Sequence, residues 1–217
     1  MARRVRIEWA PGRRVTGRIA APARSSGPAV LLAHGAGAGQ DHPFVAGLRD
    51  RLAAAGHPVL TFDYPYVEEG RRIPDRLPVL LECHRVAFER LASRGLPVVL
   101  AGKSMGGRVA SHLAAGRPGA AGLACYGYPL VSPSSGDVRD VGHLAAAGIP
   151  MLFVSGSRDR QAPLGLLRPV VEALDGAVLE VVEDADHGFR VPGRSGLDAG
   201  AVADLLAGIT TRWAAAL

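Results

Sequence analysis

The sequence is poor in lysine and in aromatic residues. The first shortage bears on its binding partners and the second on the composition of its core. Of 25 basic side chains only Lys103 is a lysine, and the arginines are scattered among 20 carboxylates. This distribution lacks the long basic stripe that follows a nucleic-acid backbone, so we expect no nucleic-acid partner. A basic arm over residues 3–14 stays a candidate for some other anionic partner. Aromatic residues make up 5% of the chain, so the core must consist mainly of Ala, Val and Leu.

Cysteines and long hydrophobic runs are also scarce. Cys83 and Cys125 lie in apolar stretches and show neither zinc-site nor Cys-x-x-Cys spacing, so we expect two buried free thiols in a reducing compartment. The N-terminal stretch lacks the apolar run of a signal peptide, and no run is long enough to span a bilayer. These shortages predict a cytoplasmic protein without a membrane partner.

The 217 residues do contain a regular alternation of apolar and amphipathic stretches, of a length that suits a single domain over residues 1–217. Segments 5–9 and 15–21 flank a Pro-Gly turn and predict a β-hairpin. Further strands are predicted at 29–34, 58–64, 97–102, 121–128, 150–156 and 177–183, and helices at 43–56, 75–95, directly after 104, 164–174 and 198–217. The pattern predicts an α/β fold with a mostly parallel sheet of about eight strands and helices on both faces.

The residues that end each predicted strand are the candidate functional residues, because active sites of such sheets gather at the carboxyl ends of the strands. Four strand ends stand out: HGAGAG (34–39), GKSMGG (102–107), SGSRD (155–159) and EDADHGF (183–189). Together they offer backbone N–H groups, a serine, an aspartate and a histidine. We expect these four loops to meet at one edge of the sheet.

The stretch GKSMGG allows two chemistries, a phosphate-binding loop or a nucleophile elbow. A phosphate loop needs a glycine five positions before Gly102, where this chain has Pro97 inside a strand, so we reject that interpretation. In Gly-x-Ser-x-Gly the serine sits on a sharp strand-to-helix turn with its hydroxyl above the sheet. Gly102 and Gly106 leave room where a β-carbon would collide with the backbone. The spacing favours Ser104 as a nucleophile, with an ordinary helix N-cap as the simpler alternative.

A serine hydroxyl needs a base to take its proton, and the base needs a carboxylate to orient it. His187, after the last strand, is the candidate base, and Asp159, after the preceding strand, is the first candidate carboxylate. This gives the chain order Ser, Asp, His. Asp184 is the second candidate carboxylate. The simpler alternatives are a surface-loop histidine at 187 and a turn aspartate that caps the next helix at 159.

With these residues in place, the sequence resembles the α/β-hydrolase superfamily, and within it the small, lid-poor, dienelactone-hydrolase-like branch of serine hydrolases. The matching features are HGAG (34–37), GKSMGG (102–107), GSRD (156–159) and DADHGF (184–189). The resemblance implies the α/β-hydrolase fold, with Ser104 as nucleophile, Asp159 as acid and His187 as base. It also implies an oxyanion hole formed by the backbone N–H groups of Ala36 and Met105.

The resemblance does not extend to a substrate. Dienelactone hydrolases carry cysteine where this chain has Ser104, so a dienelactone substrate is in doubt. The interval 126–148 is too short for a cap domain, although it could hold a loop and one short helix, and we expect an open site. Candidate substrate-binding residues are Gly35, Gly37, Tyr126 and Tyr128. The remaining histidines show no metal-ligand spacing, so neither a metal nor another cofactor is expected.

These features predict a serine hydrolase that cleaves an ester or thioester of a small molecule through an acyl-enzyme. The alternative is a non-catalytic protein that keeps the fold as an interaction surface. We expect His34 to brace the oxyanion loop by hydrogen bonds. Lys103 is interpreted as a structural residue or as part of the substrate rim, with its side chain directed away from the elbow. The oligomeric state is left open.

Overall fold

The computed structural model describes residues 2–116 and 119–217, and within them eight strands form one sheet. The strands are β1 (Arg3–Ala10), β2 (Arg13–Ala20), β3 (Ala29–Ala33), β4 (Val59–Phe62), β5 (Val98–Lys103), β6 (Gly122–Tyr126), β7 (Met151–Gly156) and β8 (Ala177–Val182). Their order in the sheet is β1-β2-β4-β3-β5-β6-β7-β8. β2 runs antiparallel to β1 and β4, whereas the strands from β4 to β8 run parallel to their neighbours. The predicted sheet with its N-terminal hairpin is confirmed.

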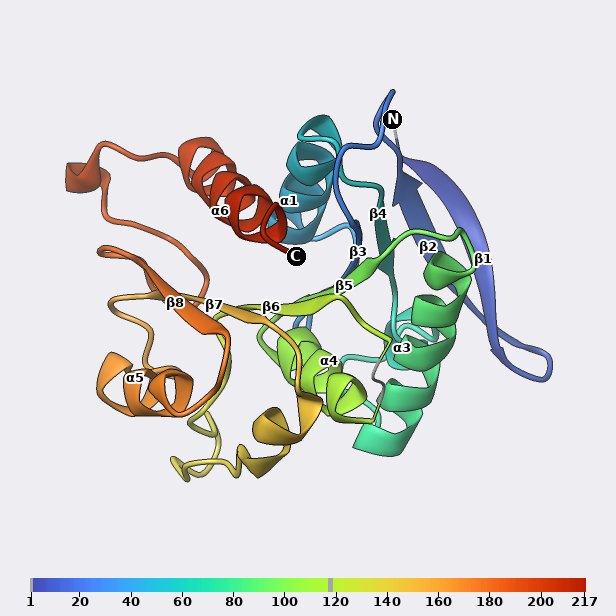
Figure 1. Ribbon diagram of the computed structural model, residues 1–217. Coiled ribbons are helices and arrows are strands. Elements are labelled where there is room, and N and C mark those ends of the chain that lie inside the picture. The colour runs from blue at the N-terminus through green and yellow to red at the C-terminus, as the bar shows by residue number, and fades with distance from the viewer. Residues whose placement is uncertain (1, 117–118) are drawn as a thin grey trace.

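Helices cover both faces of this sheet (Figure 1). They are α1 (Pro43–Ala54), α2 (Pro65–Glu68), α3 (Leu77–Ala92), α4 (Met105–Ala115), α5 (Leu164–Glu172) and α6 (Ala199–Ala214), with the 3₁₀ helices η1 (Gly142–Ala147) and η2 (Gly193–Ser195). α1 and α6 lie on one face, and α3, α4 and α5 on the other. The predicted helices are confirmed with ends shifted by a few residues. α2 and η2 were not predicted, because each is too short to show a periodicity.

Apolar layers on both faces hold the helices against the sheet. The central strands read as continuous apolar runs because they are covered on both sides. Along β5, Leu100 packs in the layer below α3 and α4, whereas Val99 and Ala101 pack in the layer below α1 and α6. A fully buried leucine side chain contributes about 2 kcal/mol to folding. Lys103, the last residue of β5, follows the same alternation as Val99 and therefore leaves the strand toward α1 and α6.

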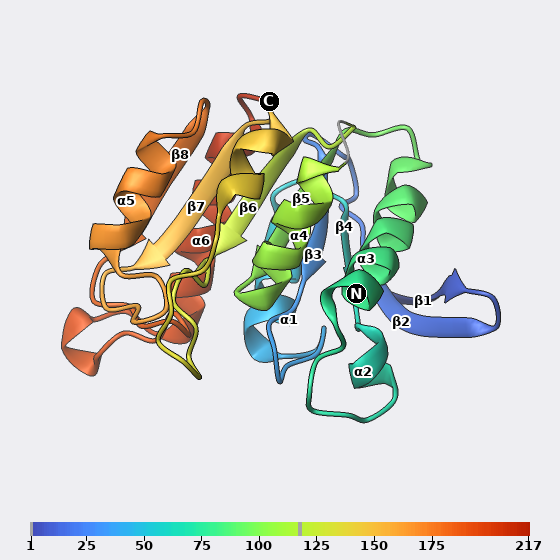
Figure 2. The same cartoon turned by 90° about the horizontal axis from the view of Figure 1, so that it is seen from below.

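The parallel strands carry their C-terminal loops to one edge of the sheet. In Figure 2 the arrowheads of β3, β6 and β7 point to the same side. The connection from β6 to β7 contains an isolated bridge between Val131 and Val138 and the helix η1, whose Leu144 is buried. This connection is a loop with one short helix, as its length predicts, so the fold has at most a minimal cap.

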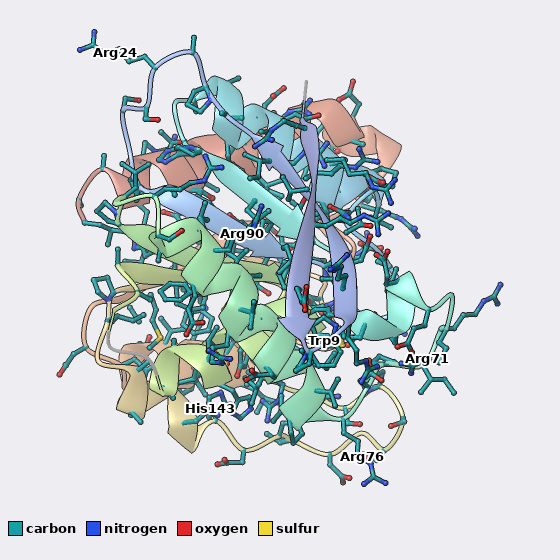
Figure 3. All side chains as sticks on the ribbon, turned by 90° about the vertical axis from the view of Figure 1, so that its right-hand side faces the viewer. Trp9, Arg24, Arg71, Arg76, Arg90 and His143 are labelled. Carbon is teal, nitrogen blue, oxygen red and sulfur yellow. The ribbon has the colours of Figure 1, made fainter. Side chains whose placement is uncertain are left out.

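Several exposed arginines lie in the connections between helices and strands. Figure 3 shows Arg24 pointing outward from the connection after β2, and Arg71 and Arg76 from the connection between α2 and α3. Arg71 pairs with Glu69 and Asp75, 2.6 and 2.7 Å away. The charge of this exposed arginine is therefore paired with carboxylates.

The structure also describes the two cysteines and the apolar character of the helices. Cys83 and Cys125 are both free and buried, as predicted, and burial raises the pKa of both thiols. Within the ranges that the structure describes, no helix has the combination of length and apolar character needed to cross a bilayer.

Candidate active site

Ser104 forms the turn between β5 and α4 and has a strained backbone. Its φ of 49° and ψ of −116° lie in a region that residues with a side chain seldom adopt. Its N–H donates to the carbonyl of Tyr126 at 2.9 Å, and its carbonyl accepts from the N–H of Arg108 at 3.1 Å. A Cβ on Gly102 would lie 2.2 Å from the carbonyl carbon of Gly106. The turn therefore depends on the backbone approach that the glycine spacing predicted.

A chain of hydrogen bonds joins Ser104, His187 and Asp159. Nε2 of His187 lies 2.9 Å from Oγ of Ser104, and Nδ1 lies 2.8 Å from Oδ2 and 3.0 Å from Oδ1 of Asp159. When Nδ1–H donates to the carboxylate, Nε2 carries no proton and can accept one from the serine. Ser104 stands at the N-cap position of α4, yet its side chain makes no capping hydrogen bond. The hydroxyl faces His187 instead, which argues against the simple N-cap interpretation.

Asp159 is held in place by its own turn. Its side chain is buried, and Oδ1 accepts from the N–H groups of Gln161 at 2.8 Å and Ala162 at 3.1 Å. Burial acts to raise the pKa of Asp159, but the hydrogen bond and charge of His187, with the two backbone N–H groups, lower it below its usual value. Asp159 thus caps a turn and also meets the imidazole. It is this carboxylate, rather than Asp184, that bonds His187.

The loop after β8 presents His187 through a tight turn at Asp186. Oδ1 of Asp186 accepts from the N–H groups of Gly188 at 2.8 Å and Arg190 at 2.9 Å. The end of β7 approaches this loop closely, since a Cβ on Gly156 would lie 2.2 Å from the carbonyl oxygen of Ala185. Sequence reasoning missed the roles of Asp186 and Gly156. An aspartate two residues before a glycine is a turn signal that could have identified the first of them.

The loop after β3 runs beside the serine. A Cβ on Gly35 would lie 3.6 Å from Cβ of Ser104, so Ala36 follows directly next to the elbow. Met105 is the first residue of α4, at the positive end of that helix. No acceptor among the described residues takes the N–H of Ala36 or of Met105. Both groups can therefore donate to a ligand.

Buried polar contacts brace the same loop. Nδ1–H of His34 donates to the carbonyl of Gly35 at 2.8 Å, and Nε2 accepts from the N–H of Tyr64 at 3.1 Å. Burial lowers the pKa of His34, which favours the neutral ring that these two bonds require. At the far end of the loop, Gln40 donates its backbone and side-chain N–H groups to Asp63, at 2.8 and 2.7 Å. Asp63 directly follows β4, so the rule about strand ends could have found it.

Two of the predicted substrate-binding side chains lie elsewhere. Tyr126 is fully buried, and its hydroxyl lies 2.8 Å from Oγ1 of Thr210 in α6. Tyr128 is also buried, and its hydroxyl lies 3.3 Å from Nε2 of His143 on the α4 side of the sheet. We therefore do not carry these two side chains into the proposed site. Gly35 lies at the elbow, and Gly37, with a φ of 69°, has open space on its Cβ side.

A parallel sheet with a serine elbow at its C-terminal edge is the architecture of an α/β hydrolase. A sequence model of the family described as "Alpha/beta hydrolase domain" matches residues 26–215, and the chain belongs to that family.

Solved structures of other proteins share the fold. The dienelactone hydrolase from Anabaena variabilis superposes with a TM-score of 0.78 at 23% identity, over 98% of this chain and 96% of that one. A serine hydrolase homologue from Coxiella burnetii gives 0.76 at 17% identity, over 97% and 96%. A serine hydrolase without a lid from Xanthomonas campestris gives 0.73 at 17% identity, over 98% and 93%. At these identities the similarity concerns the fold.

Proposed function

We propose that this chain is a serine hydrolase that cleaves carboxylic ester or thioester bonds of small molecules. The observation that carries the proposal is the unbroken hydrogen-bonded chain from Oγ of Ser104 through both ring nitrogens of His187 to Asp159. The strained backbone of Ser104 supports it, because such strain is maintained where it serves a site.

Acylation begins when Nε2 of His187 takes the proton of Ser104 while Oγ attacks the acyl carbon. The carboxylate of Asp159 stabilises the imidazolium that forms and keeps the ring oriented. Negative charge develops on the carbonyl oxygen. The N–H groups of Ala36 and Met105 donate hydrogen bonds to this oxygen and stabilise the charge. The bond between the acyl carbon and the leaving oxygen or sulfur then breaks, and His187 gives its proton to the leaving group.

Deacylation repeats these roles with water. His187 takes a proton from a water molecule whose oxygen attacks the acyl carbon, and the bond to Oγ breaks. The proton returns from His187 to Oγ of Ser104, and the carboxylic acid leaves. The connection after β6 adds only a loop and the short helix η1, so we expect the site to admit bulky acyl groups.

Labelling with a fluorophosphonate tests the proposal, because this reagent reacts with an activated serine. We expect one adduct per chain on the wild type and none on Ser104→Ala. A folded wild type that takes no adduct, or an equal adduct on Ser104→Ala, would favour the alternative of a non-catalytic interaction protein. A panel of ester, thioester and lactone substrates then identifies the preferred acyl and leaving groups.

A further inference from the structure

Lys103 is the one lysine in a chain that otherwise uses arginine for positive charge, and it directly precedes Ser104. Lysine carries a compact charge on a flexible stem, and its proton can leave when the group is buried. Arginine is planar, larger and always charged. Lys103 therefore differs in kind from the other basic residues of the chain, and the groups around its ammonium show what its charge can act on.

The ammonium group of Lys103 lies against two aromatic rings on the α1 and α6 side of the sheet. Nζ is 6.0 Å from the ring centroid of Phe44 in α1 and 5.7 Å from that of Phe189, two residues after His187. The two rings stack with their centroids 5.5 Å apart. Cation–π attraction holds the ammonium there, and the rings limit its contact with water.

The same ammonium group lies close to the hydrogen bond between His187 and Asp159. A Cβ on Gly127 would lie 3.2 Å from Nζ of Lys103, 3.2 Å from Oδ2 of Asp159 and 3.3 Å from Nδ1 of His187. The three atoms therefore lie close to one another, around the space that a side chain at Gly127 would fill. Among the described residues Lys103 has no hydrogen-bond or close ion-pair partner, so its charge acts on the pair through space.

We propose that Lys103 is a positioning residue whose positive charge disfavours a proton on His187 and so keeps the imidazole able to accept the Ser104 proton at mildly acidic pH. The proposal rests on the proposed function, in which His187 is the base. An imidazolium at 187 and an ammonium at 103 repel each other, and the partial burial of Lys103 reduces the screening of this repulsion by solvent. The same charge favours the ionised form of Asp159, which the mechanism requires.

The titratable neighbours of Lys103 decide at which pH its ammonium group is charged. The titratable groups around it are Asp159 after β7, and Asp186 and His187 after β8. Tyr126 of β6 is the register partner of Lys103, and its hydroxyl is bonded to Thr210 of α6. Burial lowers the pKa of Lys103 to about 8, whereas the two carboxylates act to raise it. The charge is thus present at neutral pH and is lost as the pH rises through about 8.

The pH dependence of the fluorophosphonate labelling rate tests the proposal without a substrate. Lys103→Met removes the charge and keeps a flexible side chain, and we expect the midpoint of the acid limb to move up by about one pH unit. Lys103→Arg keeps the charge and should hold the midpoint near that of the wild type. Arg160→Met is the matched control, because it removes an exposed cation beside Asp159, and it should move the midpoint by less than about 0.2 unit.

The outcomes separate this proposal from the proposed function. A labelled Lys103→Met protein with the midpoint of the wild type would overturn the role of Lys103 and leave the serine hydrolase intact. Absence of labelling on the folded wild type would instead contradict the serine hydrolase.

A second measurement needs neither activity nor a Lys103 variant. Lysine labelled with ¹³C and ¹⁵N gives one side-chain NMR signal in this chain, and its titration can be followed in the wild type and in Asp159→Asn. We expect Lys103 to lose its proton near pH 8 in the wild type and at lower pH in Asp159→Asn, because the variant lacks an attracting charge. Equal titration in both proteins would overturn the proposal, because it would mean that the ammonium group does not sense the carboxylate that bonds His187.

Discussion

Oγ of Ser104 and Nε2 of His187 lie 2.9 Å apart, although 83 positions of the chain separate the two residues. The serine follows β5 and the histidine follows β8, with β6 and β7 between them in the sheet. Their contact therefore forms only when four parallel strands have assembled in the correct order. A reactive Ser104 would therefore indicate that the strands from β5 to β8 have assembled in this order.

Asp159→Asn should lower kcat by about 10³- to 10⁴-fold while the protein stays folded. An asparagine can turn its amide nitrogen toward Nδ1, which favours the tautomer whose Nε2 carries the proton and cannot accept one from Ser104. Asp184→Asn is the matched control and should keep most of the activity, because Nδ1 of His187 bonds to Asp159. Steady-state kinetics with one ester substrate measures both, and a larger loss in Asp184→Asn would reverse the assignment of the carboxylate.

The activity should fall on the acid side because His187 must start neutral. We expect kcat/KM to drop about tenfold per pH unit below the midpoint. Circular dichroism at each pH shows whether the fold persists over that range. A flat profile on a folded enzyme would argue against His187 as the base.

Gly106→Ala should destabilise the fold by about 3 kcal/mol or more, because the new Cβ would lie 2.6 Å from the carbonyl oxygens of Ala33 and His34. Gly165→Ala offers a matched control in α5, where nothing lies within 4 Å of the added Cβ. Since alanine is the better helix former, this variant should be neutral or slightly stabilised. Urea unfolding compares the two. Equal stability of both variants would mean that the elbow relaxes more easily than its geometry indicates.

Acid should also weaken the fold through His84. Burial lowers the pKa of His84 to about 3. An unfolded histidine takes up a proton near pH 6.5, whereas the folded one stays neutral. The stability from this neutral state is complete above pH 6.5 and is lost as the pH falls toward 3, by up to about 1.4 kcal/mol per pH unit.

His84→Leu tests this linkage. The variant has no proton to gain at this position, so its stability should fall less steeply between pH 6.5 and 4 than that of the wild type. Urea unfolding across this range gives both slopes. Parallel slopes would show that other groups account for the acid sensitivity.

Much of the site could be predicted because each of its residues follows a strand. Continuous apolar runs located the central strands, and the chemistry of Ser104, Asp159 and His187 stood directly after three of them. Parallel strands deliver their ends to one edge, so the order of the loops was enough to bring these side chains together. The choice of Asp159 over Asp184 followed from the same rule.

The parts that escaped prediction depend on tertiary packing. Tyr126 and Tyr128 lie at the end of a predicted strand, where the sequence suggested a place in the pocket wall. The hydroxyls are instead buried under α6 and beside α4, and the positions of these helices do not follow from the local sequence. The pairing of Gln40 with Asp63 joins two loops that are neighbours only in the folded sheet. The aromatic contact of Lys103 requires α1 and the loop after β8 to meet, which no local pattern encodes.

Trapping of the acyl-enzyme tests the central claim most directly. The protein is mixed with an activated ester, quenched in acid within the first turnovers, and analysed by intact mass and by peptide mapping. We expect one acyl group per chain, located on the peptide that contains Ser104 and missing from Ser104→Ala. Hydrolysis by the wild type with no covalent species, or equal acylation and turnover by Ser104→Ala, would contradict the account.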